Sequence, residues 1–382
     1  MKKRSLLWLL AISICAVFII PMPASALPEA ELPLSAESAI LMDASDGSVL
    51  YEKNAHARKG MASTTKIMTA LVAAQSMPLD KNILIPKEAV GIEGSSVYLT
   101  EGESLTVRQL LYALLLSSAN DAATALAIAS AGSVESFAEK MNLFAKELGL
   151  SDTHFINPHG LYHEDHYTTA FELALITAAA LRNTTVKEIV STYKTYIPLG
   201  NEKKGRLLVN HNKLLKLYEG AIGVKTGFTK KTGRCLVSAA ERDGLTLIAV
   251  TLNAPDDWND HIKMLDHGFD NYESVTLFEA GEFRYPLKIM GGKEAYVVLS
   301  NKEDISMTLP KNRGKIKYTV LADRRIEFAP IYQGTVYGSI VFTADDRCVE
   351  SPLVSAYDVP VATKQKKNIF EMIFSFLSGL FT

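Results

Sequence analysis

Hydrophobic and polar residues alternate near position 40 of the chain and then recur at helical spacing over a long central stretch. The segment "SAILMDASDGSVLYEKN" alternates around Ser45-Asp46-Gly47, which predicts a β-hairpin. From Thr64 onward the apolar residues repeat every three or four positions, which predicts a series of helices. The helical runs after the first are "SLTVRQLLYALLLSS", "AATALAIASAG", "VESFAEKMNLFAKELGL" and "TTAFELALITAAALRN".

β-like patterns return in the second half of the chain. The runs "GAIGVKTGF", "RCLVSAA" and "LTLIAVTL" predict three strands, the last two joined by an Asp243-Gly244 hairpin turn, and "DDWNDHIKMLDHGFDNYES" predicts a helix. From about Val275, short runs such as "KEAYVVLS", "KIKYTVLA" and "GSIVFTA" alternate with turn residues. We therefore expect an α/β (α+β) domain over 27–274, followed by a small all-β domain over 275–362.

The first 26 residues have the pattern of an export signal. The basic lead "MKKRS" precedes the apolar run "LLWLLAISICAVFII", which is short for a membrane span, and "PMP" and Ala24-Ser25-Ala26 follow. This pattern predicts a cleaved signal peptide over 1–26, with Leu27 as the first mature residue. A retained membrane anchor is the alternative.

The last twenty residues, 363–382, combine a basic joint with an amphipathic pattern. In "IFEMIFSFLSGLFT" the polar residues Glu371, Ser375, Ser378 and Thr382 form one narrow stripe, and large apolar residues occupy the remaining positions. The segment is too short to span a bilayer, and lysines precede it. We expect a helix in the membrane interface that holds an exported protein on the outer face of the cytoplasmic membrane. A helix packed on the protein's own β domain is the alternative.

Charge and cysteine content narrow the possible functions. The chain has 40 basic and 42 acidic residues, a balance that does not suggest nucleic-acid binding. Signal cleavage removes three basic residues and no acidic one, leaving 37 against 42, or −5. Cys235 and Cys348 remain in the mature chain, and we expect two buried thiols in different domains rather than a disulfide.

The candidate chemistry begins with a serine placed three residues before a lysine at the start of the first long helix. A serine hydroxyl needs a base to act as a nucleophile, and a lysine made acidic by its surroundings can provide one. Ser63 and Lys66 can meet on one helix face. Simple helix capping by Ser63 is the bland alternative. A second match, Ser191 with Lys194, leads into β-like residues and is set aside.

Two further short motifs follow in the chain. Ser118-Ala119-Asn120 falls on a break between two predicted helices, where short polar side chains can point inward or simply cap a helix. Lys225-Thr226-Gly227 ends an apolar strand, and Gly227 allows close approach of a ligand to the backbone. A second Lys-Thr-Gly, 231–233, lies in a predicted turn and is the weaker candidate.

The order of these three motifs in an exported chain resembles that of the serine penicillin-binding proteins and β-lactamases, most of all the low-molecular-mass D-alanyl-D-alanine carboxypeptidases. The resemblance implies a transpeptidase-like catalytic domain that acts on peptidoglycan stem peptides ending in D-Ala-D-Ala, is inhibited by β-lactams and needs no cofactor. Within this family, the chain most resembles the Gram-positive spore-former branch, some of whose members trim spore-cortex peptidoglycan.

The resemblance also implies roles for individual residues. Ser63 would be the acylated nucleophile and Lys66 its base, and Ser118 and Asn120 would relay a proton and hold the substrate amide. Lys225 and Thr226 would bind the terminal carboxylate, while Gly227 and Phe228 border the site. The backbone N–H groups of Ser63 and Phe228 would form the oxyanion hole.

Departures from the family pattern leave alternatives open. Ala119 replaces the aspartate of class A β-lactamases, and the Glu-x-x-Leu-Asn segment those enzymes use for deacylation is not found, which disfavours a β-lactamase. The arginine that anchors the substrate carboxylate in some relatives has no match, and His211 occupies the "NHNKLL" segment instead.

Two other readings come from different classes of protein. The segment "THFINPHGLYHEDH" contains His154, His159, His163 and His166 and suggests a zinc peptidase. We expect a polar surface loop there, because Asn157-Pro158 and Gly160 break any helix that could present two ligands. The third reading, an inactive wall-binding module, is disfavoured because all nucleophile, base and relay positions are filled.

Overall fold

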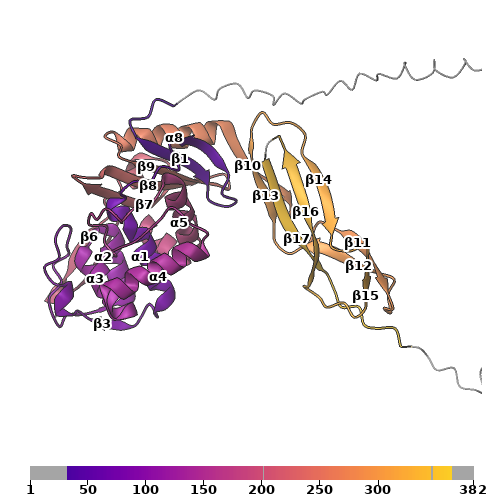
Figure 1. The fold of residues 1–382 in the computed structure, drawn as a ribbon, viewed down its shortest axis with the longest axis horizontal. Helices are drawn as coiled ribbons and strands as arrows, with labels where there is room; N and C mark the ends of the chain where they lie inside the picture. Colours follow the sequence, from indigo (N-terminus) through magenta and orange to yellow (C-terminus); the bar gives the residue numbers. More distant parts are fainter. Residues whose placement is uncertain (1–31, 201, 346, 364–382) are drawn as a thin grey trace, which may run out of the picture. The chain divides into compact units, whose positions relative to one another are not determined.

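The computed structural model describes residues 32–200, 202–345 and 347–363 (Figure 1). The predicted signal peptide, 1–26, and the amphipathic stretch that follows the basic joint lie outside the described residues. Within the described ranges, no helix is both long enough and apolar enough to cross a membrane.

A five-stranded antiparallel sheet forms the centre of the larger part of the protein. Its strands run in the order β2-β1-β9-β8-β7. Both predicted hairpins are present, and the turn between β8 and β9 places Asp243 and Gly244 at φ 49° and 78°, as a two-residue hairpin turn requires. The strands are β1 (Ser38–Asp43), β2 (Val49–Lys53), β7 (Ala221–Thr229), β8 (Gly233–Arg242) and β9 (Leu245–Leu252).

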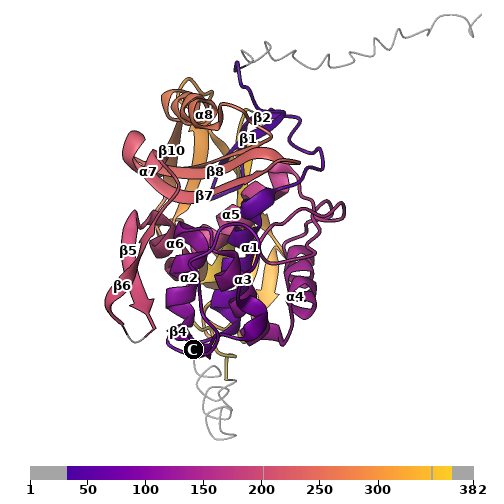
Figure 2. The same cartoon turned by 90° about the vertical axis from the view of Figure 1, so that its left-hand side faces the viewer.

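Helices cover both faces of this sheet. Helix α8 packs on one face, and α1, α5 and α6 pack on the other (Figures 1 and 2). Several begin at side-chain caps, such as the reciprocal Thr106–Gln109 capping box of α2 and the Thr169 cap of α5. The helices are α1 (Lys66–Ser76), α2 (Val107–Leu116), α3 (Asn120–Ala131), α4 (Val134–Glu147), α5 (Ala170–Arg182), α6 (Thr184–Ser191), α7 (Leu214–Leu217) and α8 (Asp257–Asn271), with the 3₁₀ turns η1 (Ala62–Thr65) and η2 (Lys87–Ala89).

Helix α1 is enclosed over most of its length. It contacts α2, α3, α4 and α5, and Figure 2 shows α2 and α3 beside it. Every residue from Lys66 to Ala73 is buried, so its whole circumference faces protein. The alanine-rich composition follows, because short side chains let neighbouring helices approach closely.

Two pairs of strands outside the main sheet were not predicted as hairpins, although the residues after Lys194 have a β-like pattern. β3 (Asn82–Leu84) pairs with β4 (Ser104–Thr106), and β5 (Lys194–Leu199) pairs with β6 (Glu202–Val209). Three-residue strands are too short to show a period in the sequence. The β5–β6 hairpin is also tied to a distant segment, because Arg206 forms a buried ion pair with Glu103 at 3.0 Å.

The C-terminal part is all-β, as predicted. Its core is formed mainly by leucine, isoleucine, valine and phenylalanine side chains, including Leu287, Val297 and Leu353. A six-stranded sheet has the order β14-β16-β17-β12-β11-β15, and β10 pairs with β13. The strands are β10 (Tyr272–Phe278), β11 (Tyr285–Met290), β12 (Tyr296–Asn301), β13 (Ile305–Pro310), β14 (Lys317–Ala322), β15 (Ile326–Phe328), β16 (Val336–Ala344) and β17 (Arg347–Ser355).

The prediction of two buried thiols is wrong for one of them. Both cysteines are free, but Cys235 is buried in β8 whereas Cys348 is exposed. Residues of β17 alternate between the two sheet faces, and Cys348 shares the outer face with Glu350. The sequence of β17 does not show which face is covered.

Candidate active site

A strained turn places Ser63 directly before helix α1. Ala62 has φ 47°, unusual for a residue with a side chain, and Ser63 lies in the 3₁₀ turn η1 that leads into α1. Lys66 is the first residue of α1, and its Nζ donates a hydrogen bond to Ser63 Oγ at 2.9 Å. Lys66 Nζ also donates to the carbonyl oxygen of His159 at 2.5 Å. The serine and lysine are therefore in direct contact.

Two buried lysines face this turn. Burial, and then the charge of Lys225, hold the pKa of Lys66 well below that of an ordinary lysine, while Asp121 acts in the opposite direction. Burial lowers the pKa of Lys225 to about 7. A lysine that loses its proton readily can accept one from a hydroxyl, so the electrostatics suit Lys66 as a base.

The break between α2 and α3 presents Ser118 and Asn120. Ser118 has φ 57° and is almost fully buried. Asn120 Nδ2 donates to the Glu93 carbonyl at 2.5 Å, but its Oδ1 is buried without a hydrogen-bond partner among the described residues. A buried acceptor of this kind is costly unless something donates to it. A substrate N–H would fit that requirement.

Strand β7 forms the free edge of the main sheet beside the nucleophile turn. Lys225 Nζ donates to the Thr226 carbonyl at 2.9 Å. A Cβ added to Gly227 would lie 3.0 Å from the Ser63 nitrogen and 3.1 Å from the Thr64 nitrogen. Gly227 therefore lets the edge strand and the nucleophile turn approach closely, whereas the sequence predicted close approach of a ligand at this position.

These elements surround a cleft of about 340 Å³. It contains residues from all three motifs together with several that the sequence did not indicate. The lining residues are Ser63, Ser95, Ser118, His211, Thr226, Gly227, Phe228, Arg234, Asp257 and Trp258.

Arg234 is the cation in the cleft that sequence reasoning missed. It is the cross-strand partner of Phe228, and its Nη2 donates to Asp257 at 2.8 Å. Its Nε is buried without a partner among the described residues, and 43% of the side chain is exposed. His211 also lines the cleft, and its pKa is lowered by burial and by Lys225. The pairing of β7 with β8 was a usable signal, because it puts Arg234 opposite Phe228.

The histidine-rich segment is only partly the surface loop we expected. His163, Glu164 and Asp165 are exposed, but Pro158 and Gly160 are buried and His159 is mostly buried. His166 is also buried, against the Thr65 hydroxyl at 2.8 Å. The expectation is wrong for this half because the loop packs under the nucleophile turn. Among the described residues, no group of three or more His, Cys, Asp and Glu side chains is arranged to hold a metal ion.

The duplicate motifs lie elsewhere. Ser191 ends α6, and its hydroxyl donates to the carbonyls of Lys187 and Ile222 at 2.8 and 2.7 Å. Its partner Lys194 begins β5 and is exposed. Lys231 and Thr232 lie in the turn between β7 and β8. None of these residues lines the cleft.

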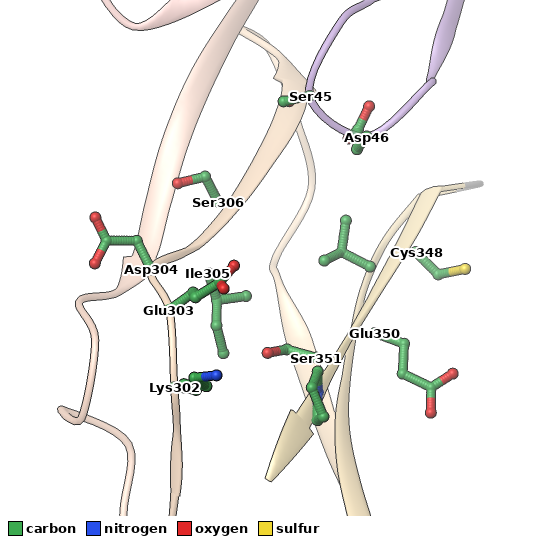
Figure 3. Close-up of a pocket in the computed structure, with 12 residues that line it drawn as sticks. Ser45, Asp46, Lys302, Glu303, Asp304, Ile305, Ser306, Cys348, Glu350 and Ser351 are labelled. Atoms are coloured by element: carbon green, nitrogen blue, oxygen red, sulfur yellow. The ribbon is translucent and has the colours of Figure 1, made fainter. Parts of the chain in front are cut away.

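A larger hollow, of about 720 Å³, lies apart from the three motifs. It is lined by Ser45 and Asp46 of the β1–β2 turn and by residues of β13, β17 and the turn before β13 (Figure 3). The Asp304 and Glu350 side chains point in opposite directions (Figure 3). The hollow therefore presents no convergent set of catalytic groups.

Gly160 offers a test of the nucleophile turn. It has φ 86°, and an added Cβ would lie 1.9 Å from the Ala62 carbonyl oxygen. We expect Gly160→Ala to lower the free energy of unfolding by about 2 kcal/mol or more and to slow acylation at least about tenfold, because it displaces Ser63. Thermal unfolding and the rate of penicillin labelling measure both effects.

Gly132 is the matched control for this change. It has φ 85° at the end of α3, with nothing within 4 Å of an added Cβ. Gly132→Ala should cost about 1 kcal/mol and leave labelling unchanged. Equal behaviour of the two variants would contradict the role of Gly160 in shaping the nucleophile turn.

Comparison with known proteins covers nearly the whole chain. The pattern of the D-alanyl-D-alanine carboxypeptidase family matches residues 25–256, and that of the penicillin-binding protein 5 C-terminal domain matches 272–366. The chain is 35% identical to D-alanyl-D-alanine carboxypeptidase DacF of Bacillus subtilis (strain 168), over 87% of this chain and 88% of the relative. Identity to D-alanyl-D-alanine carboxypeptidase DacA of Escherichia coli (strain K12) is 30%, over 91% and 88%. The crystal structure of penicillin binding protein 5 from Haemophilus influenzae is similar, with a TM-score of 0.74 and 28% identity over 87% of this chain and 99% of that one.

Proposed function

Because the chain belongs to the family of serine-type D-alanyl-D-alanine carboxypeptidases, we propose that Ser63 is its acylated nucleophile and Lys66 the base that activates it. The observation that carries this assignment is the 2.9 Å contact between Ser63 Oγ and a fully buried lysine amine. The substrate is the peptidoglycan stem peptide that ends in D-Ala-D-Ala. Peptide mapping of a penicilloyl adduct tests the assignment.

Acylation begins with transfer of the Ser63 hydroxyl proton to the neutral amine of Lys66. The His159 carbonyl supports this step. A carbonyl oxygen can only accept a hydrogen bond, so it orients one N–H of the neutral Lys66 amine toward itself. The Lys66 lone pair is then free to accept the serine proton. Ser63 Oγ attacks the carbonyl carbon of the penultimate D-alanine, and the new oxyanion rests on the backbone N–H groups of Ser63 and Phe228. The closeness of Gly227 to the Ser63 nitrogen supports this oxyanion hole.

Breakdown of the tetrahedral intermediate requires a proton on the departing amine. Ser118 passes a proton from the Lys66 ammonium to the nitrogen of the terminal D-alanine, and the C–N bond breaks. Asn120 Oδ1 accepts a hydrogen bond from an N–H of the substrate backbone, which supplies the partner that this buried oxygen lacks among the described residues. Water then hydrolyses the ester, regenerates Ser63 and releases the shortened peptide.

The terminal carboxylate of the substrate requires cationic and hydroxyl partners. We assign this contact to Lys225 and Thr226, as the family motif implies, and add Arg234 from the neighbouring strand. Arg234 lies in the cleft with a buried Nε that has no partner in the described part of the chain, and Asp257 holds its guanidinium in place. Arginine suits this task because its planar guanidinium can form two parallel hydrogen bonds with a carboxylate. His211 borders the same cleft.

Arg234→Gln is expected to raise KM for a peptide with a free terminal carboxylate about tenfold, because one charge-assisted contact is lost. A substrate whose terminal carboxylate is esterified should be affected little. Arg242→Gln is the control, since Arg242 donates to the Glu219 carbonyl and is not among the cleft residues. Equal losses on both substrates would show that Arg234 acts on folding or positioning rather than on the carboxylate.

Export and membrane attachment form the second part of the proposal. The basic and apolar pattern of residues 1–26 supports a cleaved signal peptide, and the amphipathic tail supports peripheral attachment to the outer face of the cytoplasmic membrane. We keep the domain limits of 27–274 and 275–362 as a proposal, although β10, which pairs with β13, already begins at Tyr272. A role in spore-cortex peptidoglycan rests on the resemblance to the spore-former branch. Analysis of muropeptides from spores that lack the protein tests that role.

Removing Asn368 to Thr382 should release the mature protein from membranes, because the apolar side chains of the tail supply the attachment. Activity on a soluble peptide should stay largely intact. Flotation with vesicles and a peptidase assay measure the two properties. Truncated protein that floats with membranes as well as the parent does would contradict attachment through the tail or indicate an uncleaved signal.

A further inference from the structure

One end of the C-terminal sheet carries large apolar side chains on its outer face. We call Lys288, Met290, Tyr296, Ile326 and Phe328 the end face. The four apolar members are 49%, 53%, 37% and 62% exposed, in chain order. The inner face of the same strands is already apolar, with Leu287, Ile289 and Val297 buried. A sheet with one face in a core ordinarily carries polar residues on the other, so the end face requires an explanation.

Strand register makes the end face continuous. β11 pairs in parallel with β15, with Lys288 opposite Ile326 and Met290 opposite Phe328. It pairs antiparallel with β12, with Lys288 also opposite Tyr296. Cross-strand partners point to the same side of a sheet, so all five side chains share one surface. Figure 1 shows these three strands grouped at one end of the β domain.

The described chain ends beside this face. Ala362 N donates to the Gly291 carbonyl at 2.8 Å, and Lys293 N donates to the Pro360 carbonyl at 2.9 Å. These bonds hold the segment 360–362 against the turn between β11 and β12. The described chain therefore ends, at Thr363, near the border of the end face.

Charged residues of both signs adjoin the end face along the chain. Lys293 and Glu294 lie in the turn between β11 and β12, and Asp323, Arg324 and Arg325 lie just before β15. These residues do not by themselves select a strongly charged partner. Tyrosine, phenylalanine and methionine around a lysine match the region between lipid headgroups and acyl chains, where aromatic rings and lysine stems are favoured. Lys364, Lys366 and Lys367 of the adjoining segment supply attraction to anionic lipids.

We propose that the end face is a second membrane contact, which lies in the interface of an anionic bilayer beside the C-terminal tail. The inference rests on the proposed membrane attachment and extends it from the tail to the folded β domain. Two adjacent apolar contacts bind a bilayer more tightly than one and limit how the β domain can tilt on it.

A tryptophan introduced into the end face tests the contact in the mature full-length protein. Trp258 is the one tryptophan left after signal removal, and its signal is subtracted with the parent protein. Phe328→Trp is measured with vesicles of phosphatidylglycerol and phosphatidylcholine whose acyl chains carry bromine. We expect a blue-shifted emission that bromine quenches. Tyr196→Trp, at an exposed position of β5, is the control and should not be quenched.

The outcomes separate this inference from the attachment on which it rests. Protein that floats with vesicles while the tryptophan at 328 stays unquenched overturns the end-face contact and leaves tail attachment standing. Protein that does not float overturns both. A blue shift without vesicles also overturns the contact, because the tail or a second copy then covers the face.

A variant that introduces two negative charges into the end face provides an independent measurement. Tyr296→Glu combined with Phe328→Glu should weaken binding to anionic vesicles about tenfold or more, while peptidase activity in solution stays unchanged. Tyr196→Glu is the matched control. Equal vesicle affinity of the double variant and the parent protein would overturn the proposal.

Discussion

Ser63→Ala is expected to abolish both peptidase activity and penicillin labelling, with a loss of activity of at least about 10⁴-fold. The substitution removes the hydroxyl that forms the acyl-enzyme. This hydroxyl accepts a hydrogen bond from the buried amine of Lys66. Mass spectrometry of the soluble protein after brief incubation with penicillin measures the adduct, and peptide mapping locates it. EDTA should affect neither property in the parent protein.

The second Ser-x-x-Lys match provides the control. Ser191→Ala should keep full activity and labelling, because its hydroxyl donates to two backbone carbonyls outside the cleft. In the parent protein the penicilloyl adduct should outlast one turnover of peptide substrate, since the leaving amine stays tethered in the opened β-lactam ring. An adduct on Ser191 would reverse the choice of nucleophile. Rapid turnover of the β-lactam would favour a β-lactamase of the same fold.

Lys66→Arg is expected to slow acylation about 10³-fold or more while the protein still folds. Arginine keeps the positive charge but does not deprotonate at working pH, so it cannot accept the Ser63 proton. The rate of penicillin labelling measures the step. In the parent protein this rate should rise with pH as Lys66 loses its proton, and the rise should come at lower pH than for an ordinary lysine, because burial and Lys225 lower its pKa.

Two further variants test whether a loss of labelling comes from the missing base or from a disturbed structure. Lys66→Met removes the amine at similar size and should lose labelling to a similar extent, which guards against misfolding by the bulkier arginine in a fully buried position. Lys194→Arg changes the exposed lysine of the duplicate motif and should have no effect. Near-normal labelling in either Lys66 variant would remove this lysine from the base role.

Local patterns determined the main elements of the fold. The Asp243-Gly244 turn, the helix that follows Ser63 and the break at Ser118-Ala119-Asn120 were predicted because each depends on backbone preferences and on periodicity over a few residues. The order of the three motifs also identified the family, since each motif is contiguous. The strands β3 to β6 were not predicted. Contacts between distant segments, such as the ion pair of Arg206 with Glu103, help to hold them.

The assembled cleft depended on contacts that no local pattern contains. The His159 carbonyl that holds Lys66 is a backbone group, so residue type cannot reveal it, and the same packing buries half of a loop that reads as surface. Arg234 enters the cleft only through the pairing of β7 with β8, and Asp257 comes from the start of α8. The way the chain packs leaves Cys348 exposed and buries Lys66 and Lys225, which lowers the pKa values of both lysines. The sequence by itself determined which groups are present and where the local elements begin. Only the tertiary structure decided their distances and solvation, because both depend on segments far apart in the chain.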